Sequence, residues 1–332
     1  MRGVAAEVIE DAAALEALQP EWRDLWRRRP AALPFQAPEW LIPWWRHFSP
    51  GSLFVLCARR DGRLVGIAPG YIEHGPLGRR ILPLGISLSD HLDVLVDPDC
   101  ADAALAALAA AAQSRSDAWD VWELEELLPD AMALRLPLPA GWSEAVHPQS
   151  ACPVLTVHQA VELRFLAPKA KRQNLNTARN RAARRGTVRI ARAEGDMVPA
   201  AFEDMVRLHG ARWTSRGAPG LLRSEAVLGF HREVLPLLDR AGLLRFYTLA
   251  IDKRVVATHY GLMAGGSAHV YMTGFDPDYA FASPGAILAA HAIEDAMREG
   301  CREIDFLRGR EPYKYEWGAE DRWNLKRSIR HG

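Results

Sequence analysis

The sequence predicts a mixed α/β (α+β) protein made of two similar halves in tandem. Each half is expected to hold a mixed, mostly antiparallel sheet flanked by helices. Two observations support this class: both halves contain a tight-turn hairpin, and in both the hairpin is followed by a strand, a helix and a strand. This order differs from the strict strand–helix alternation of a doubly wound parallel sheet. The 332 residues suffice for about two domains.

In the first half, a helix rich in tryptophan and arginine is predicted at residues 21–29. A hairpin follows, because two apolar runs at 53–58 and 64–71 flank the turn sequence RDGR. The next strand, helix and strand are predicted at 91–96, 102–113 and 119–125.

The second half repeats this order. A helix is predicted at 202–216, and the hairpin strands at 243–251 and 255–263. The strand, helix and strand that follow are predicted at 269–275, 284–299 and 303–307. Residue matches between the halves are weak, so an internal duplication is a hypothesis that rests on element order.

A domain boundary is predicted where prolines and small polar residues interrupt the periodic patterns, at residues 147–159. We therefore expect an N-terminal domain at 1–150 and a C-terminal domain at 160–332.

Composition excludes several classes of protein. Lys+Arg and Asp+Glu are equal at 41 each, so no overall charge attracts nucleic acid or membrane. The four cysteines are far apart, which predicts neither a zinc cluster nor a disulfide framework, and a cytoplasmic location is expected. The acidic N-terminus does not resemble a signal peptide, and the Ala-rich stretch at 101–112 is too short for a transmembrane helix.

The strongest chemical signal is the predicted helix start Ser283-Pro284-Gly285-Ala286. Ser283 suits an N-cap and Pro284 the first helical position. Gly285 and Ala286 leave the first turn without bulky side chains. Such a helix start offers free backbone N–H groups and a positive dipole end to a phosphate or pyrophosphate. The alternative is a well-capped helix without a ligand.

The corresponding helix of the first half begins among three aspartates, which would repel a phosphate. Only the second half is therefore expected to bind a phosphate-bearing cofactor. The three are Asp97, Asp99 and Asp102.

Beyond this helix the chain reads REIDFLRGREPYKYEWG, from Arg302 to Gly318. Together with KAKRQNLNTARNRAARRG, HGARWTSRG, PFQAPEWLIPWWRHF and SDHLDVLV, this segment resembles the CelD-like branch of the GNAT superfamily of N-acetyltransferases. That branch is associated with cellulose and exopolysaccharide biosynthesis and is related to the FemAB-type transferases. The resemblance implies a tandem double GNAT-like fold whose C-terminal half binds acetyl-CoA or another acyl-CoA.

The implied activity is acyl transfer, most simply acetyl transfer, to an amine on an amino sugar or related small molecule. By the resemblance, Ser283, Pro284, Gly285 and Ala286 would contact the pyrophosphate, and Tyr279 would belong to the same site. FemAB-type relatives instead take an aminoacyl group from tRNA, and this donor stays open. A non-catalytic accessory role in exopolysaccharide synthesis is the third reading.

Direct attack of an amine on a thioester needs a proton acceptor and a proton for the leaving thiolate. Asp305 lies between Ile304 and Phe306 in a strand, so its side chain should point away from theirs. Such a carboxylate needs a pocket or a partner, for which Arg308 and Lys314 are near in sequence. The alternative for Asp305 is a structural ion pair.

The other catalytic candidates are His259, in the second hairpin strand, and Tyr271 in the next strand. Tyr271 or Tyr279 could supply the proton to the thiolate. Strict alternation would place His269, Tyr271 and Phe275 on one face. The alternative for the tyrosines is ordinary packing with a hydrogen-bonded hydroxyl.

Substrate contacts are expected from Arg308, Tyr313 and Lys314, in the loop after the Asp305 strand. By family analogy, Asp90 and His91 in the first half would face a cleft between the domains. A metal site is not expected, because two acids and one histidine in a short stretch do not fix a coordination geometry.

The segment from Arg164 to Arg192 contains ten Lys/Arg and no Asp/Glu. It predicts a helix at 168–185 with a thin apolar stripe of Leu175, Ala178 and Ala182. Such a run is usually a solvated face, yet it could attract an anionic ligand. The predicted helix at 168–185 lacks aromatic residues for base stacking, so nucleic acid is not the expected partner.

Overall fold

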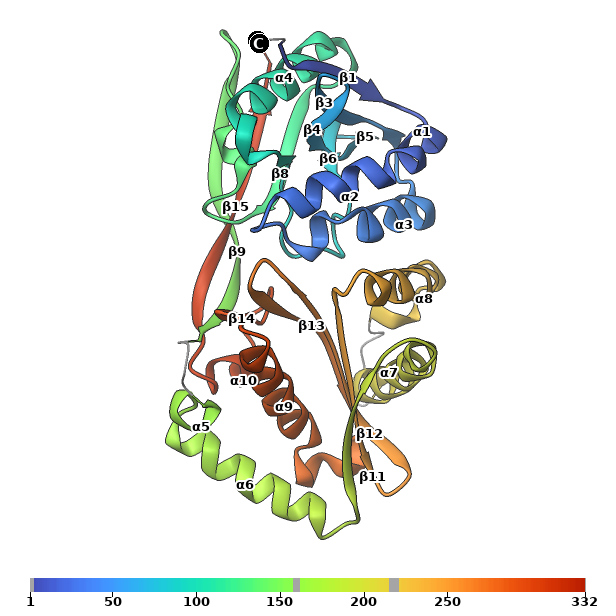
Figure 1. The fold of residues 1–332 in the computed structure, drawn as a ribbon, viewed down its shortest axis with the longest axis vertical. Helices are drawn as coiled ribbons and strands as arrows, with labels where there is room; N and C mark the ends of the chain where they lie inside the picture. The colour runs from blue at the N-terminus through green and yellow to red at the C-terminus, as the bar shows by residue number, and fades with distance from the viewer. Residues whose placement is uncertain (1–2, 158–161, 215–220, 332) are drawn as a thin grey trace. The chain divides into compact units, whose positions relative to one another are not determined.

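The structure is a computed structural model that describes residues 3–157, 162–214 and 221–331 (Figure 1). The chain divides into two compact units: unit 1 is Met1–Ser150 with Trp323–Gly332, and unit 2 is Ala151–Arg322. It passes from one unit to the other within two strands, β9 (Ser143–Thr156) and β15 (Glu320–Arg330).

The chain divides between Ser150 and Ala151, inside the predicted boundary at 147–159, but the division falls within β9, a strand of 14 residues, and not in an irregular segment. Its unit 2 part pairs with β14 (Glu303–Asp305), as in Ile304 opposite Leu155. Residues 158–161 lie outside the described part of the chain. The last ten residues, expected in the second domain, belong to unit 1, because the end of β15 pairs with β8 (Val121–Leu127).

Unit 1 has two sheets. One has the antiparallel order β1-β3-β4-β7, and in the other β2-β5-β6-β8-β15 only the β6–β8 pair is parallel. The strands are β1 (Ala5–Ile9), β2 (Ser52–Leu53), β3 (Val55–Arg60), β4 (Arg63–Ala68), β5 (Gly70–Gly75), β6 (Gly78–Pro83) and β7 (Leu95–Val96). The helices are α1 (Ala12–Ala17), α2 (Gln19–Arg28), α3 (Pro38–Phe48) and α4 (Ala101–Ser114).

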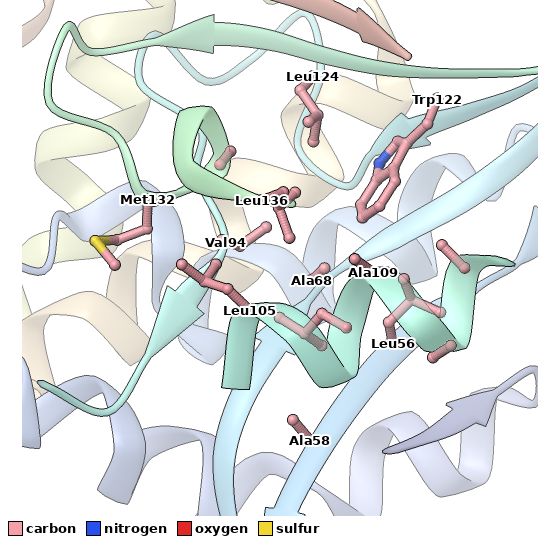
Figure 2. Close-up of a cluster of buried hydrophobic side chains, with 14 of the residues drawn as sticks. Leu56, Ala58, Ala68, Val94, Leu105, Ala109, Trp122, Leu124, Met132 and Leu136 are labelled. Carbon is pink, nitrogen blue, oxygen red and sulfur yellow. The ribbon is translucent and has the colours of Figure 1, made fainter. Parts of the chain in front are cut away.

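The core of unit 1 forms where α4 packs on β3 and β4 (Figure 2). Leu105 of α4 and Leu56 of β3 are each 1% exposed, and Trp122 of β8 is 4% exposed. α4 presents mostly alanines to the sheet, which allows a close approach of helix and strands.

The predicted strand at 91–96 is confirmed only for Leu95–Val96. Before it, the Asp93 carboxylate accepts hydrogen bonds from the backbone N–H groups of Val94, Met132 and Ala133, at 2.7–2.8 Å. Met132 and Ala133 begin a 3-10 helix, so the Asp93 carboxylate satisfies two donors at a helix start that have no partner within the helix.

Unit 2 is built on a sheet in the order β10-β11-β12-β13-β14-β9, antiparallel except for the parallel β13–β14 pair. Its further strands are β10 (Val188–Ala193), β11 (Leu244–Ile251), β12 (Arg254–Ala264) and β13 (Ser267–Phe275). Its helices are α5 (Leu163–Leu166), α6 (Lys169–Ala183), α7 (Met197–Thr214), α8 (Glu225–Arg240), the 3-10 helix η6 (Pro277–Ala282), α9 (Pro284–Arg298) and α10 (Pro312–Tyr315).

Within unit 2, α6 and α9 cover one face of the sheet, and α7 and α8 cover the other (Figure 1). The predicted basic helix is confirmed as α6, whose stripe of Leu175, Ala178 and Ala182 is buried. α9 begins with Pro284 at its first position and stops before Gly300, whose φ of 83° suits a residue without a side chain.

The predicted element order is present in both units. β1-β3-β4-β7 and β10-β11-β12-β13 are both antiparallel series, and each is followed by a helix and a strand. The helix expected at 202–216 is α7, and the part of that expectation beyond Thr214 lies outside the described residues.

Candidate functional site

In unit 2, β13 and β14 separate after three residue pairs. Their parallel ladder joins Ser267–His269 to Glu303–Asp305, and then β14 ends while β13 continues to Phe275. β13 also carries a bulge, because Val270 and Met272 oppose successive residues of β12 and Tyr271 is the extra residue. A bulge bends its strand and re-aims side chains, as strands next to active sites often require. From Val270 onward, β13 has an edge that β14 does not cover.

A pocket lies at this separation, between α9 and the sheet. His259 and His269 contribute from the strands, and Ile304 and Phe306 line the β14 side. Its free space is about 20 Å³, enough for one water-sized group. The helix side is lined by the small residues Ala289, Ala292 and Ala296.

His259 is 4% exposed and stands opposite Tyr247 in the β11–β12 ladder. Burial and, to a smaller extent, the nearby His291 together lower the pKa of His259 to about 4. The imidazole is therefore neutral at pH 7. Its Nδ1 atom is buried without a hydrogen-bond partner among the residues that the structure describes.

Asp305 is fully buried. Ile304 and Phe306 belong to the core cluster beside α9, so the Asp305 side chain points to the opposite face of the sheet, as the sequence predicts. Its carboxylate accepts a hydrogen bond from the Leu307 N–H at 2.7 Å and pairs with Arg322 at 2.5 Å. Arg322, a β15 residue far from Asp305 in sequence, is a partner that sequence reasoning missed. Lys314, one of the two predicted partners, instead pairs with Glu311. Arg308 as a partner of Asp305 stays a prediction.

His269 is the register partner of Asp305 across the parallel pair, so both side chains point to the same face. A ring nitrogen of His269 and a carboxylate oxygen of Asp305 lie within 4.8 Å of each other. His269 is 1% exposed. This histidine–carboxylate pair sits where the two strands separate.

Tyr271 packs into an aromatic cluster on the α7/α8 side, with its ring centroid 4.9 Å from that of Tyr260 and 5.6 Å from that of His231. Phe275 instead packs beside the α9-side core. The expectation that Tyr271 and Phe275 share a face is therefore wrong, because the bulge at Tyr271 breaks the alternation. Tyr271 and His259 lie on opposite sides of the sheet.

The predicted helix start is confirmed at Pro284, with a correction for Ser283. Ser283 occupies the N-cap position, but its side chain makes no capping hydrogen bond, because its backbone is left-handed at φ 44°. Its carbonyl accepts hydrogen bonds from Ala286 N at 3.0 Å and Ile287 N at 3.3 Å. The first turn still carries only small side chains, and a Cβ on Gly285 would meet only the Phe275 ring, at 3.7 Å.

Residues 169–315 match the family model described as an acetyltransferase (GNAT) domain. The segment thus resembles a GNAT domain, and it is called the GNAT-fold domain below for this likeness. No curated protein matches the sequence.

Solved structures extend the likeness beyond the GNAT-fold domain. FemX aligns at 11% identity and a TM-score of 0.68, over 97% of this chain and 96% of FemX. L-PGS from Bacillus licheniformis aligns at 12% identity and a TM-score of 0.57, over 97% of this chain and 92% of L-PGS. A conserved protein of unknown function from Bacteroides thetaiotaomicron aligns at 14% identity and a TM-score of 0.57, over 96% of this chain and 97% of that protein. Identities this low show the fold alone, and they confirm the predicted mixed α/β class over nearly the full length.

In the loop that follows β14 of the GNAT-fold domain, Lys314 is a structural residue. Its ammonium group donates to the carbonyls of Leu307, Arg308 and Gly309 at 2.7–3.0 Å and pairs with Glu311 at 3.0 Å. Its side chain is 4% exposed, so the expected substrate contact is corrected to a role in shaping this loop. Arg308 is half-buried and Tyr313 is 37% exposed; their substrate roles stay predictions.

Asp90 and His91 belong to unit 1, outside the GNAT-fold domain. The Asn324 side-chain amide donates to the Asp90 carbonyl at 2.7 Å and to Glu126 Oε2 at 2.8 Å, and lies 3.2 Å from His91 Nδ1. Their predicted role in binding substrate stays a prediction. Asn324 was missed, because its place beside them depends on the return of β15 to unit 1.

Exposed cations lie on α6 of the GNAT-fold domain and just after its C-terminal end. On α6 they are Lys169, Arg172, Arg179 and Arg181, and after it Arg184 and Arg185. Lys171 is the exception: it is buried, donates to Glu316 at 2.8 Å and lies over the Trp317 ring. Among the described residues, no helix is long and apolar enough to cross a membrane.

Proposed function

We propose that unit 2 transfers an acetyl group from acetyl-CoA to an amine on an amino sugar or related small molecule. The observation that carries this proposal is the pocket beneath α9, at the separation of β13 and β14. Its alanine lining and small free space fit an acetyl group better than a long acyl chain. The first turn of α9 adds small side chains and a positive dipole end for the pyrophosphate.

In this reaction the amine nitrogen attacks the thioester carbon, a C–N bond forms and the C–S bond breaks. Backbone N–H groups on the uncovered edge of β13 polarise the carbonyl. The amine approaches at the strand separation from the face opposite α9, to which His269 and Asp305 point. Its proton passes to His269, and Asp305 orients the imidazole and stabilises its charged form. The departing thiolate takes a proton, for which Tyr271 in the β13 bulge is the candidate, because Tyr279 lies in η6, before the start of α9.

His259 is the weaker choice of base. With a pKa lowered to about 4, its conjugate acid releases the proton too readily to accept one efficiently from an amine near pH 7. We therefore place His259 in the wall of the acetyl pocket, where a neutral ring costs less to bury than a charged one.

The acceptor class and a role in polysaccharide assembly rest on the family resemblance. An aminoacyl-tRNA donor is the second candidate function. The exposed cations of α6 favour it, because several of them could bind the phosphates of RNA.

Release of free thiol from acetyl-CoA, with amino sugars offered in turn as acceptors, tests the proposal. We expect acceptor-dependent release, and a loss of at least tenfold in kcat for Asp305→Asn, because the amide cannot stabilise the His269 imidazolium. Glu303→Gln is the matched control. Glu303 also pairs with Arg322, at 3.0 Å, so the variant weakens the same ion-pair network, but Glu303 lies two residues before Asp305 and is not the register partner of His269. No acceptor-dependent release, with transfer from charged tRNA instead, would contradict acetyl-CoA as the donor.

A further inference from the structure

One end of α6 carries arginines that lie against two aromatic rings of η6. The guanidinium carbon of Arg185 is 5.4 Å from the centroid of Phe281 and 5.9 Å from that of Tyr279. Arg254, from the β11–β12 hairpin, lies 5.6 Å from the Tyr279 centroid. These distances fall in the range of cation–π contacts, and they hold the arginines and rings as one surface. We call Arg181, Arg184, Arg185, Tyr279 and Phe281 the α6–η6 patch.

The arginines of this patch are not neutralised by carboxylates of the described residues. Arg184 and Arg185 are exposed, and neither forms an ion pair with any residue in the described part of the chain. Arg181 donates to the Phe281 carbonyl at 3.1 Å, and no carboxylate among the described residues pairs with its charge. Arg254 is the exception, since it pairs with Asp276 at 2.6 Å.

Phe281 has an unusual position for a large apolar side chain. It is 44% exposed, yet it is flanked by Arg185 and anchored through its carbonyl by Arg181. An exposed aromatic ring among unpaired guanidinium groups fits a ligand that combines a flat aromatic base with phosphates. The ring stacks on the base, and the guanidinium groups bind the phosphate oxygens.

We infer that the α6–η6 patch binds the adenosine 3′,5′-bisphosphate end of the acyl-CoA donor. This inference rests on the proposed function for the identity of the ligand. It explains why the loop before α9 can lack arginine: η6 holds no arginine, and the cations come from α6 instead.

The test is calorimetric titration with adenosine 3′,5′-bisphosphate and acetyl-CoA. Arg185→Glu should weaken both ligands at least tenfold at low salt, because it reverses a charge and removes the guanidinium from both rings. Phe281→Ala should weaken them about threefold or more, and Phe281→Trp should restore binding. Binding of an uncharged pantetheine thioester should not change in any variant.

Arg172→Glu is the matched control. It is the same charge reversal on the same helix, at an exposed residue outside the patch, and should leave affinity within twofold. Equal losses for Arg172→Glu and Arg185→Glu, or unchanged affinity in a folded Arg185→Glu protein, would overturn the inference while acetyl-CoA remains the donor. If the wild-type protein binds neither ligand, both the inference and the proposed donor fail.

Discussion

Asp305 shows how a buried carboxylate is retained in this fold. The charge is compensated by Arg322, whose side chain is only 25% exposed, and by the Leu307 N–H. Leu307 has a left-handed backbone at φ 58°, and the Asp305 side chain helps to hold that conformation. Strained backbone of this kind persists only when its surroundings fix it, and it often occurs at functional sites. The Asp305 interactions therefore fit a site residue whose geometry is set in advance.

Asp93 in unit 1 gives a pH-dependent prediction. Burial raises its pKa from 3.8 to about 6, although three backbone N–H groups and Arg29 favour the charged form. Because the folded state holds this proton more tightly than the unfolded state, the Asp93 contribution to stability is present at low pH and is lost as pH rises through about 6. The stability of the wild-type protein relative to Asp93→Asn should thus increase between pH 7.5 and pH 5.

Urea denaturation of both proteins at the two pH values measures this difference. The buried His231 and His259, with pKa values lowered to about 3 and 4, act in the opposite direction, but they are common to both proteins and cancel. A stability difference that does not change with pH would show that Asp93 titrates normally.

At the scale of elements, strand and helix order could be predicted from the sequence because each element carries its own signal. The hairpin turns, the Pro284 helix start and the α6 stripe depend on neighbouring residues only. The bulge at Tyr271 left no such signal, since an extra residue is defined by its pairing with β12. The same holds for Arg322 and Asn324, whose partners Asp305 and Glu126 are brought near by β15.

Candidate site residues were predicted less well than elements for the same reason. Residue type and spacing pointed to Asp305 and to the α9 start, which occupy places consistent with a site. Lys314 was misjudged, because a lysine that binds three carbonyls of its own loop looks in sequence like one that binds a ligand. His269 was placed on its strand but given no role until its register with Asp305 was known.

The α9 start gives the element-scale prediction. Gly285→Glu should weaken acetyl-CoA binding at least tenfold, because it places a carboxylate where the pyrophosphate would lie. The fold should tolerate it, since a Cβ there makes only an ordinary contact with Phe275. Gly210→Glu in α7 is the matched control: the same change in a helix, with no atom within 4 Å of the added Cβ. Equal affinity in the two variants would remove the α9 start from the site.

At the scale of the whole molecule, two units with the same order of elements differ at the start of their corresponding helices. In unit 1, Asp97 occupies the turn before α4, and Asp99 and Asp102 lie beside it. In unit 2, α9 has no acidic residue in its first turn. If both units once had the same role, only unit 2 has kept an end that suits a phosphate.

The central claim is that unit 2 takes its acyl group from acetyl-CoA, and its most direct test is calorimetric titration of the wild-type protein. Plain CoA and an uncharged pantetheine thioester serve as comparators. The account predicts micromolar binding of acetyl-CoA, similar binding of CoA, and much weaker binding of the pantetheine thioester, because the phosphates contribute much of the affinity. Absence of acetyl-CoA binding, or equal binding of the pantetheine thioester, would contradict it.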